Sequence, residues 1–301
     1  MFDRLILTEE LVDCRGELLA VRGSVLSPES IAECAACAPP LPRRALGETP
    51  LAADVEVPLG DPTYRHLLAN AATREAVRRV LLGVLLPEPL LDELLALRRA
   101  ESPIHAHAFV TAAVAVRMLL GIVGEARGVP ELAAAALLHD LGMCHLPPRV
   151  SRLRDRLGRD EAARVAAHPL LGAYHLARVL GAHPAVQAAL GHHWRCGQGY
   201  PVLASPPTRS MEVVSVASAF AALTQPRPFR SSAYDARGAA DVLVTEAQAG
   251  QADANTVKLL VLALRGGGGD PRQIRFGRER VGHGPDVNRH VHVSAPARSP
   301  V

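Results

Sequence analysis

The stretch LLHDLGM, residues 137–143, sets an imidazole beside a carboxylate at the end of an apolar helix predicted to begin at Glu131. Burial of His139 and Asp140 in such a helix is unfavourable unless both side chains find polar partners. A divalent ion such as Zn, Mn or Fe satisfies an imidazole and a carboxylate together. Because two residues alone cannot hold an ion, this stretch predicts further metal ligands elsewhere in the chain.

Histidines gather in the middle of the chain. Of the 13 histidines, nine fall in one interval: His105, His107, His139, His145, His168, His175, His183, His192 and His193. A single helical histidine is more often a packing residue than a ligand, but packing alone does not explain so many together. The pair His192-His193 also runs into GQGYP, residues 197–201, a turn-forming segment that predicts the end of a helix. The collective pattern favours a metal site.

The order and spacing of these residues resemble the HD-GYP family, a branch of the HD superfamily of metal-dependent phosphohydrolases. The matching positions are His107, LHDLG at 138–142, HPxxG at 168–172, His192-His193, GYP at 199–201, ALT at 222–224 and RPFR at 227–230. The resemblance extends from about residue 100 to residue 265 and is more specific than a two-residue motif. It implies an HD-type helical bundle.

The resemblance also implies roles for these residues. Asp140 would bridge two divalent ions that activate water for attack on a phosphodiester, and Asp140 and His139 would be the catalytic pair. His107 and His139 would serve one ion, and His168, His192 and His193 the other. Gly199, Tyr200 and Pro201 would shape the nucleotide pocket. Arg230 would neutralise phosphate charge, with an exposed solubilising arginine as an equally weighted alternative.

Several positions depart from the family pattern. Ser218 occupies the position of an Asp that ligates the metal, and Ala221 replaces a second acid that commonly follows. Met143 replaces a Lys that acts at the scissile phosphate, and a lost preorganised charge of this kind typically costs ~10²–10³ in rate. The segment 193–197 is also one residue shorter than the usual His-His loop of the family and lacks both of its acids, and such a loss commonly weakens metal binding by ~10–100-fold. One tightly bound ion (Fe, Mn or Zn) is therefore expected rather than two.

Two functions fit this pattern. The first is a metal-dependent cyclic di-GMP phosphodiesterase of bacterial signalling. The second is a degenerate HD-GYP domain that has lost turnover and acts as a nucleotide-responsive or protein-interaction module. The retained histidines and Asp140 favour the first, whereas Ser218, Met143 and the altered His-His loop favour the second.

Composition supports a mainly α-helical protein. Hydrophobic residues make up 49% of the chain and aromatic residues 3%, which favours closely packed helices over a β-sandwich. The periodicity predicts helices near 64–83, 87–99, 104–125, 130–142, 160–180, 184–194, 209–223, 235–249 and 253–265. These predictions define a helical domain at 61–265.

The two ends of the chain differ from this helical domain. Residues 1–60 are predicted to form a small α+β module with short strands between Leu11 and Leu26, a helix capped by Ser27, and a loop at 38–62. This module is a candidate site for protein partners. Residues 266–301 form a tail expected to be disordered, with a marginal strand at Val287–Val293 as the alternative and His290 and His292 as a solvated pair.

Charge and apolar patterning limit the class of partner. The net charge of the chain is 33 − 30 = +3. The tail alone has six Arg and three acids, which is also +3, so the rest of the chain is formally neutral and no binding surface for duplex nucleic acid is expected. The longest apolar segment, 110–124, is interrupted by Arg117, and no signal peptide is evident, which predicts a cytoplasmic protein without a membrane span. The five cysteines are expected to be reduced thiols, Cys34 and Cys37 included.

Overall fold

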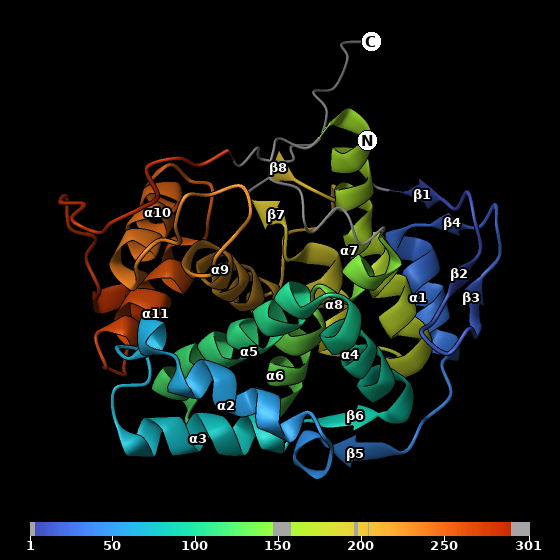
Figure 1. Ribbon diagram of the computed structural model, residues 1–301, viewed down its shortest axis with the longest axis horizontal. Helices are drawn as coiled ribbons and strands as arrows, with labels where there is room; N and C mark the ends of the chain where they lie inside the picture. Colours follow the sequence, from blue (N-terminus) through green and yellow to red (C-terminus); the bar gives the residue numbers. More distant parts are fainter. Residues whose placement is uncertain (1–3, 147–157, 196–197, 204, 290–301) are drawn as a thin grey trace.

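The computed structural model describes residues 4–146, 158–195, 198–203 and 205–289. These residues form a mainly helical structure (Figure 1). The helices are α1 (Pro28–Cys37), α2 (Ala52–Gly60), α3 (Ala71–Leu82), α4 (Glu88–Ala100), α5 (Ser102–Val123), α6 (Gly128–Leu138), α7 (Arg159–Leu180), α8 (Pro184–Gly191), α9 (Arg209–Thr224), α10 (Ala236–Gln248) and α11 (Ala254–Leu264). Short 3-10 helices are η1 (Leu46–Glu48), η2 (Pro62–Tyr64), η3 (Leu141–His145) and η5 (Pro271–Gln273).

The strands of the described residues are short and pair two by two. They are β1 (Leu5–Ile6), β2 (Leu11–Val12), β3 (Leu18–Ala20), β4 (Val25–Leu26), β5 (Arg43–Ala45), β6 (Leu85–Pro87), β7 (Trp194–Arg195) and β8 (Gln198–Gly199). The antiparallel pairs are β1 with β4, β2 with β3, β5 with β6, and β7 with β8. The mainly α fold class predicted from the sequence is therefore confirmed.

Helix α5 is the centre of the bundle. It packs against α6 and α9, and α2, α3, α4 and α11 also contact it. By length and a mean hydropathy of 1.9 it could cross a membrane, but 67% of its apolar window is buried among the other helices, as in the core helix of a soluble protein. Arg117 on α5 is buried and donates from Nε to the Leu67 carbonyl at 2.9 Å. In Figure 1, α5 and α6 lie between α10 and α11 on one side and β1–β4 on the other.

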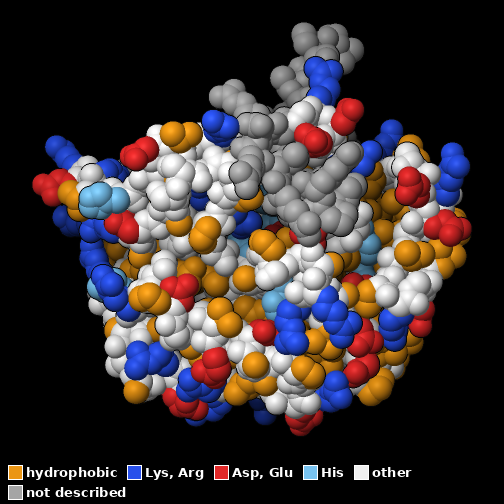
Figure 2. All heavy atoms as spheres, viewed as in Figure 1, with side chains coloured by type: hydrophobic (Ala, Val, Ile, Leu, Met, Phe, Trp, Pro, Cys, Tyr) orange, Lys and Arg blue, Asp and Glu red, His pale blue; other side chains and the backbone are white. Residues whose placement is uncertain are grey.

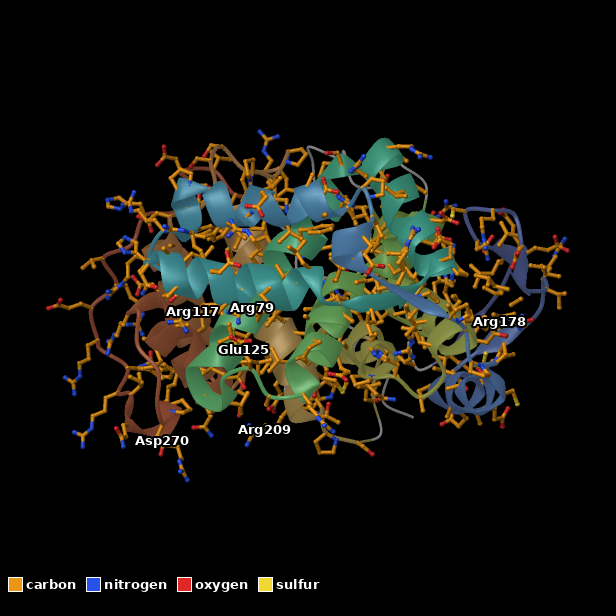
Figure 3. All side chains as sticks on the ribbon, turned by 90° about the horizontal axis from the view of Figure 1, so that it is seen from below. Arg79, Arg117, Glu125, Arg178, Arg209 and Asp270 are labelled. Carbon is orange, nitrogen blue, oxygen red and sulfur yellow. The ribbon has the colours of Figure 1, made fainter. Side chains whose placement is uncertain are left out.

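Salt bridges fix the outer helices to this centre at the surface. Arg79 of α3 lies 3.3 Å from Glu125, which follows α5, and the two side chains lie next to one another in Figure 3. Such exposed pairs contribute about 0–1 kcal/mol each, so burial of apolar surface stabilises the bundle far more.

The N-terminal residues form the predicted strands and helix. The β2–β3 hairpin turns near Gly16, and the turn between β3 and β4 contains Gly23; their positive φ values of 80° and 86° favour glycine. Ser27 caps α1, as predicted, and α1 packs against α7. Leu26 and Ile31 belong to the same hydrophobic core as the helical bundle. The domain boundary near residue 60 stays a prediction.

The predicted loop at 38–62 was wrong in part. Strand β5 pairs with β6, and α2 follows η1. The proline content of this segment obscured a helical pattern in which Leu51, Val55 and Leu59 recur every four residues and are buried. The Thr49 hydroxyl accepts from the amide of Leu51 at 3.2 Å and so supports the start of α2.

The predicted helices agree with the structure except at a few ends, and the helix expected at 64–83 begins only at Ala71. The helix expected at 130–142 ends at Leu138, because Asp140 leaves helical geometry (φ −98°, ψ 11°) and η3 begins after it. The helix expected at 184–194 ends at Gly191, so His192 and His193 lie beyond its last turn. In both cases the metal-ligand candidates lie where a helix ends.

The tail was expected to be disordered, but up to Arg289 it forms hydrogen bonds with the helical domain. The Ser231 amide donates to Val287 O at 2.9 Å, and the Gly282 amide donates to Asp241 of α10 at 3.0 Å. Asn288 forms an isolated β-bridge with Arg230. The part of the alternative strand (Val287–Val293) that follows Arg289 lies outside the described residues. Hydrogen bonds to α10 and to the loop before it hold a segment whose composition alone suggested disorder. His290 and His292 lie outside the described residues.

Glycines of two motifs allow η3 and α7 to approach backbone to backbone. A Cβ atom on Gly142 would overlap the carbonyl oxygen of His168 and lie 2.6 Å from the Gly172 amide nitrogen. A Cβ atom on Gly172 would lie 2.8 Å from the Gly142 amide nitrogen. This contact holds Asp140 against the helix that carries His168.

We expect Gly142→Ala to lower the free energy of unfolding by about 1–3 kcal/mol or more, because backbone atoms cannot move aside as a side chain can. Urea unfolding followed by circular dichroism measures this loss. Gly128→Ala in α6 is the matched control, since its Cβ meets open space, and it is expected to be neutral or slightly stabilising. Equal stability of the two variants would refute the close contact.

Candidate metal centre

The six residues predicted as metal ligands lie together in the structure. His107 comes from α5, His139 and Asp140 from the end of α6, His168 from α7, and His192 and His193 from the end of α8. They form two groups that share Asp140, one with His107 and His139 and one with His168, His192 and His193. Within each group the ligand atoms lie within 4.8 Å of one another. Figure 2 shows histidine side chains near the centre of one face, with charged side chains of both signs around its rim.

The two carboxylate oxygens of Asp140 face different histidines. Oδ1 lies 3.2 Å from His168 Nε2 and 3.1 Å from His192 Nε2. Oδ2 lies 3.5 Å from His139 Nε2 and 3.7 Å from His107 Nε2. This is the arrangement that a carboxylate bridging two ions requires.

Hydrogen bonds orient the imidazoles for metal binding. Nδ1 donates to a backbone carbonyl in His139 (Ala136 O, 2.7 Å), in His168 (Val165 O, 2.6 Å) and in His192 (Ala189 O, 3.0 Å). Each Nε2 of a neutral ring therefore carries a lone pair toward Asp140.

The lone pairs of His168 and His192 also face one another, with Nε2 to Nε2 at 3.2 Å. Two lone pairs this close repel one another unless a metal ion or a proton lies between them. Ligands about 2.0–2.1 Å from a tetrahedral ion are spaced by about 3.3 Å, which is close to the observed triangle of Asp140 Oδ1 and the two nitrogens. The residues present therefore fit a divalent ion.

The charge state of the site favours a cation. Burial lowers the pKa of His107 to about 4 and that of His139 to about 3. Burial alone would raise the pKa of Asp140, but the imidazoles of His139, His168 and His192 hold it well below its usual range. At neutral pH an anionic carboxylate thus lies beside the neutral rings of His107 and His139.

These shifts predict that the metal-free protein loses stability in acid. The unfolded chain takes up protons on histidine near pH 6.5, whereas His107 and His139 resist protonation in the folded state until pH falls to about 4 and about 3. Stability is therefore fully present above about pH 6.5 and falls by several kcal/mol toward about pH 4. Urea unfolding of chelator-treated protein at a series of pH values measures this, with replacement of the exposed His66 by Gln as control. A flat profile, or one altered by His66→Gln, would exclude this origin.

Ser218 lies where the sequence predicted a missing ligand. Its Oγ is 3.2 Å from His107 Nε2 and 3.1 Å from His139 Nε2. A neutral hydroxyl therefore lies beside both histidines of the Oδ2 group, where a carboxylate would supply negative charge. The Oδ1 group has no such substitution.

The GYP segment lies beside His193. The ring of Tyr200 stacks on the ring of His193 at 4.6 Å with an interplanar angle of 23°. Gly199 has a φ of 99°, which favours glycine, and Tyr200 and Pro201 are buried. Burial and neighbouring histidines lower the pKa of His193 well below its usual value, so its ring stays neutral as a ligand requires.

Arg230 contacts the end of α9. Its Nη1 donates to Ala222 O at 2.9 Å at the end of α9, and burial lowers its pKa to about 10. Arg227 instead reaches the site, with Nη2 3.4 Å from His107 Nδ1. The sequence pointed to the RPFR segment, but the direction of each arginine depends on the turn that follows α9. Gln225 Oε1 lies 3.0 Å from His107 Nδ1, closer than Arg227, and favours this nitrogen as the hydrogen-bond donor.

The remaining residues singled out in the sequence have other surroundings. His105 lies 3.2 Å from Asp54, and His183 accepts from the Ala185 amide at the start of α8. His145 and His175 pair with each other. Met143 is half-buried against the hydrophobic core. Cys196 and Gly197 of the altered His-His loop lie outside the described residues.

Comparison with known proteins agrees with this geometry. Residues 90–256 match the HD domain family. Over 107 residues the chain is 32% identical to the 3'3'-cGAMP-specific phosphodiesterase 1 of Vibrio cholerae serotype O1, an alignment that covers 34% of this chain and 24% of that protein. The chain thus spans less than two thirds of the length of this relative. Because the family match covers more than half of the chain and includes all six metal-ligand candidates, the protein belongs to the HD domain family of phosphohydrolases, of HD-GYP type.

Proposed function

We propose that this protein is a metal-dependent phosphodiesterase that hydrolyses a cyclic dinucleotide. The observation that carries the proposal is the division of Asp140 between two histidine groups, with Oδ1 facing His168 and His192 and Oδ2 facing His107 and His139. Divalent ions held there would activate water and neutralise charge on a phosphodiester.

The two histidine groups would bind their ions with different affinities. Asp140, His168, His192 and His193 would hold one ion (Fe, Mn or Zn) tightly. His107 and His139 would hold a second ion weakly, because Ser218 brings no negative charge to that side. The buried backbone acceptors of Nδ1 would keep the histidines in the tautomer that binds metal.

The substrate would be cyclic di-GMP or a close analogue. Tyr200 and His193 together present a stacked aromatic pair beside the metal-ligand candidates, and bases stack on such rings. The relative from Vibrio cholerae carries the name of a 3'3'-cGAMP-specific phosphodiesterase, so 3'3'-cGAMP is a second candidate substrate. The N-terminal residues would serve protein partners or sensing in the cytoplasm.

Arg227 would contact the phosphate in place of Arg230. We expect Arg227→Gln to lower kcat/KM by roughly 10–100-fold, as expected for loss of a charged hydrogen bond. Steady-state kinetics of purified protein measures this. Arg230→Gln is the matched control, which should lower thermal stability more than it changes KM because Arg230 binds carbonyls of α9. Normal kinetics of Arg227→Gln would remove this residue from the substrate site.

The function is tested by incubating the protein with each cyclic dinucleotide and Mn²⁺ or anaerobic Fe²⁺, and resolving products by chromatography. We expect linear dinucleotide or mononucleotide from the native protein and none from His139→Ala. Metal binding without product from either nucleotide would overturn the proposal.

The alternative function is a regulatory domain that binds nucleotide without turnover. Ser218 and the apolar side chain of Met143 favour this alternative, because both replace charged groups expected for catalysis. Calorimetric titration of cyclic di-GMP into the same preparation separates the two functions: binding without hydrolysis supports the regulatory domain.

A further inference from the structure

A second cluster of metal-ligand side chains lies apart from the Asp140 groups. It consists of Cys144, His145 and His175, whose ligand atoms lie within 4.8 Å of one another. We infer that these three residues form a zinc site. The site requires no phosphodiesterase activity, so it stands independently of the proposed function.

The geometry of the two imidazoles fits a shared ion. His145 Nε2 lies 3.2 Å from His175 Nδ1, close to the spacing of about 3.3 Å between ligand nitrogens of a tetrahedral zinc ion. His175 has no exposed side-chain surface, and its Nε2 is buried without a hydrogen-bond partner. That nitrogen lies 3.9 Å from Glu93 Oε1, a buried carboxylate placed to orient the ring once Nδ1 binds the ion.

The donor set distinguishes this site from the Asp140 groups. A thiolate with two imidazoles suits zinc, and also copper, whereas carboxylate and imidazole also suit Mn and Fe. Burial of a thiol, a carboxylate and a histidine pair is unfavourable without a cation. Zinc would satisfy the thiol and both rings at once.

The cluster joins η3 to α7, and the buried Glu93 beside it contacts the N-terminal hairpin. Cys144 and His145 belong to η3, which follows Asp140 directly, and His175 lies on α7 seven residues after His168. Glu93 on α4 accepts from the backbone amide of Cys14 in the β2–β3 hairpin at 2.7 Å. Zinc would therefore hold η3, which follows Asp140, against the helix that carries His168.

Cobalt substitution of the full chain tests the site. Thiolate ligands give Co²⁺ a charge-transfer band in the near ultraviolet, and the described residues of the Asp140 groups include no cysteine. We expect this band in the native protein, its loss in Cys144→Ser, and its retention in His139→Ala. Elemental analysis of zinc-loaded protein should show about one ion per chain fewer in Cys144→Ser than in the native protein.

Controls locate the thiolate. Cys196→Ser and Cys34→Ser should keep the band, and His175→Gln should lose it or shift it. No charge-transfer band in native protein saturated with Co²⁺ would overturn the inference regardless of how any variant folds. A band that survives Cys144→Ser, or that disappears with Cys196→Ser, would overturn it too.

Discussion

Asp140→Asn is expected to remove the tightly bound ion and to lower phosphodiesterase turnover by at least about 10²–10³-fold. The substitution keeps the shape of the side chain but removes the negative charge that lies among four histidine Nε2 atoms. An amide also offers only one acceptor oxygen, so it cannot serve both groups. Elemental analysis and product chromatography on the same sample measure the two losses.

Asp54→Asn is the matched control for this substitution. Asp54 also pairs with a buried histidine, His105 at 3.2 Å, but lies outside the metal-ligand groups. We expect it to alter stability and to leave metal content and turnover unchanged. Full metal content in Asp140→Asn would show that the histidines alone bind the ion, and the bridging role would be abandoned.

Ser218→Asp is expected to strengthen metal binding on the Oδ2 side by roughly 10–100-fold. The new carboxylate would lie beside His107 and His139, where the hydroxyl is now within 3.2 Å of both rings. Turnover should rise with it, because a second ion stabilises both attacking and leaving oxygens of a phosphodiester. Titration of metal into the Cys144→Ser background counts only the ions of the Asp140 groups.

Ser218→Asn separates charge from size in this experiment. It has nearly the same volume as the aspartate variant without its charge, and we expect it to leave metal content unchanged. If Ser218→Asp increases neither the metal content nor the activity, the missing acid at this position is not what weakens metal binding on the Oδ2 side.

Much of the site could be predicted from sequence because its residues lie in motifs. The motifs LHDLG and HPxxG contain both the predicted ligands and the glycines that allow η3 to pack against α7. The position of Ser218 followed from the same pattern. The structure adds the direction of each lone pair, which depends on backbone acceptors such as Ala136 O and Val165 O that no motif specifies.

Other features could not be predicted for physical reasons. Helix α2 was not predicted because of the prolines around it, although the buried residues Leu51, Val55 and Leu59 follow a helical period. His145 and His175 were visible as histidines, but they are 30 residues apart and only the packing of η3 on α7 makes them a pair. Arg227 and Arg230 lie in one motif, and the turn that follows α9 gives their side chains different directions.

The most direct test of the account is a crystal structure of the protein soaked with Mn²⁺, with anomalous differences collected at the manganese edge. We predict that the strongest anomalous peak lies between Asp140 Oδ1, His168 Nε2 and His192 Nε2, with a weaker peak or none beside Ser218. A strongest peak on the Ser218 side, or no peak at Asp140, would contradict the account.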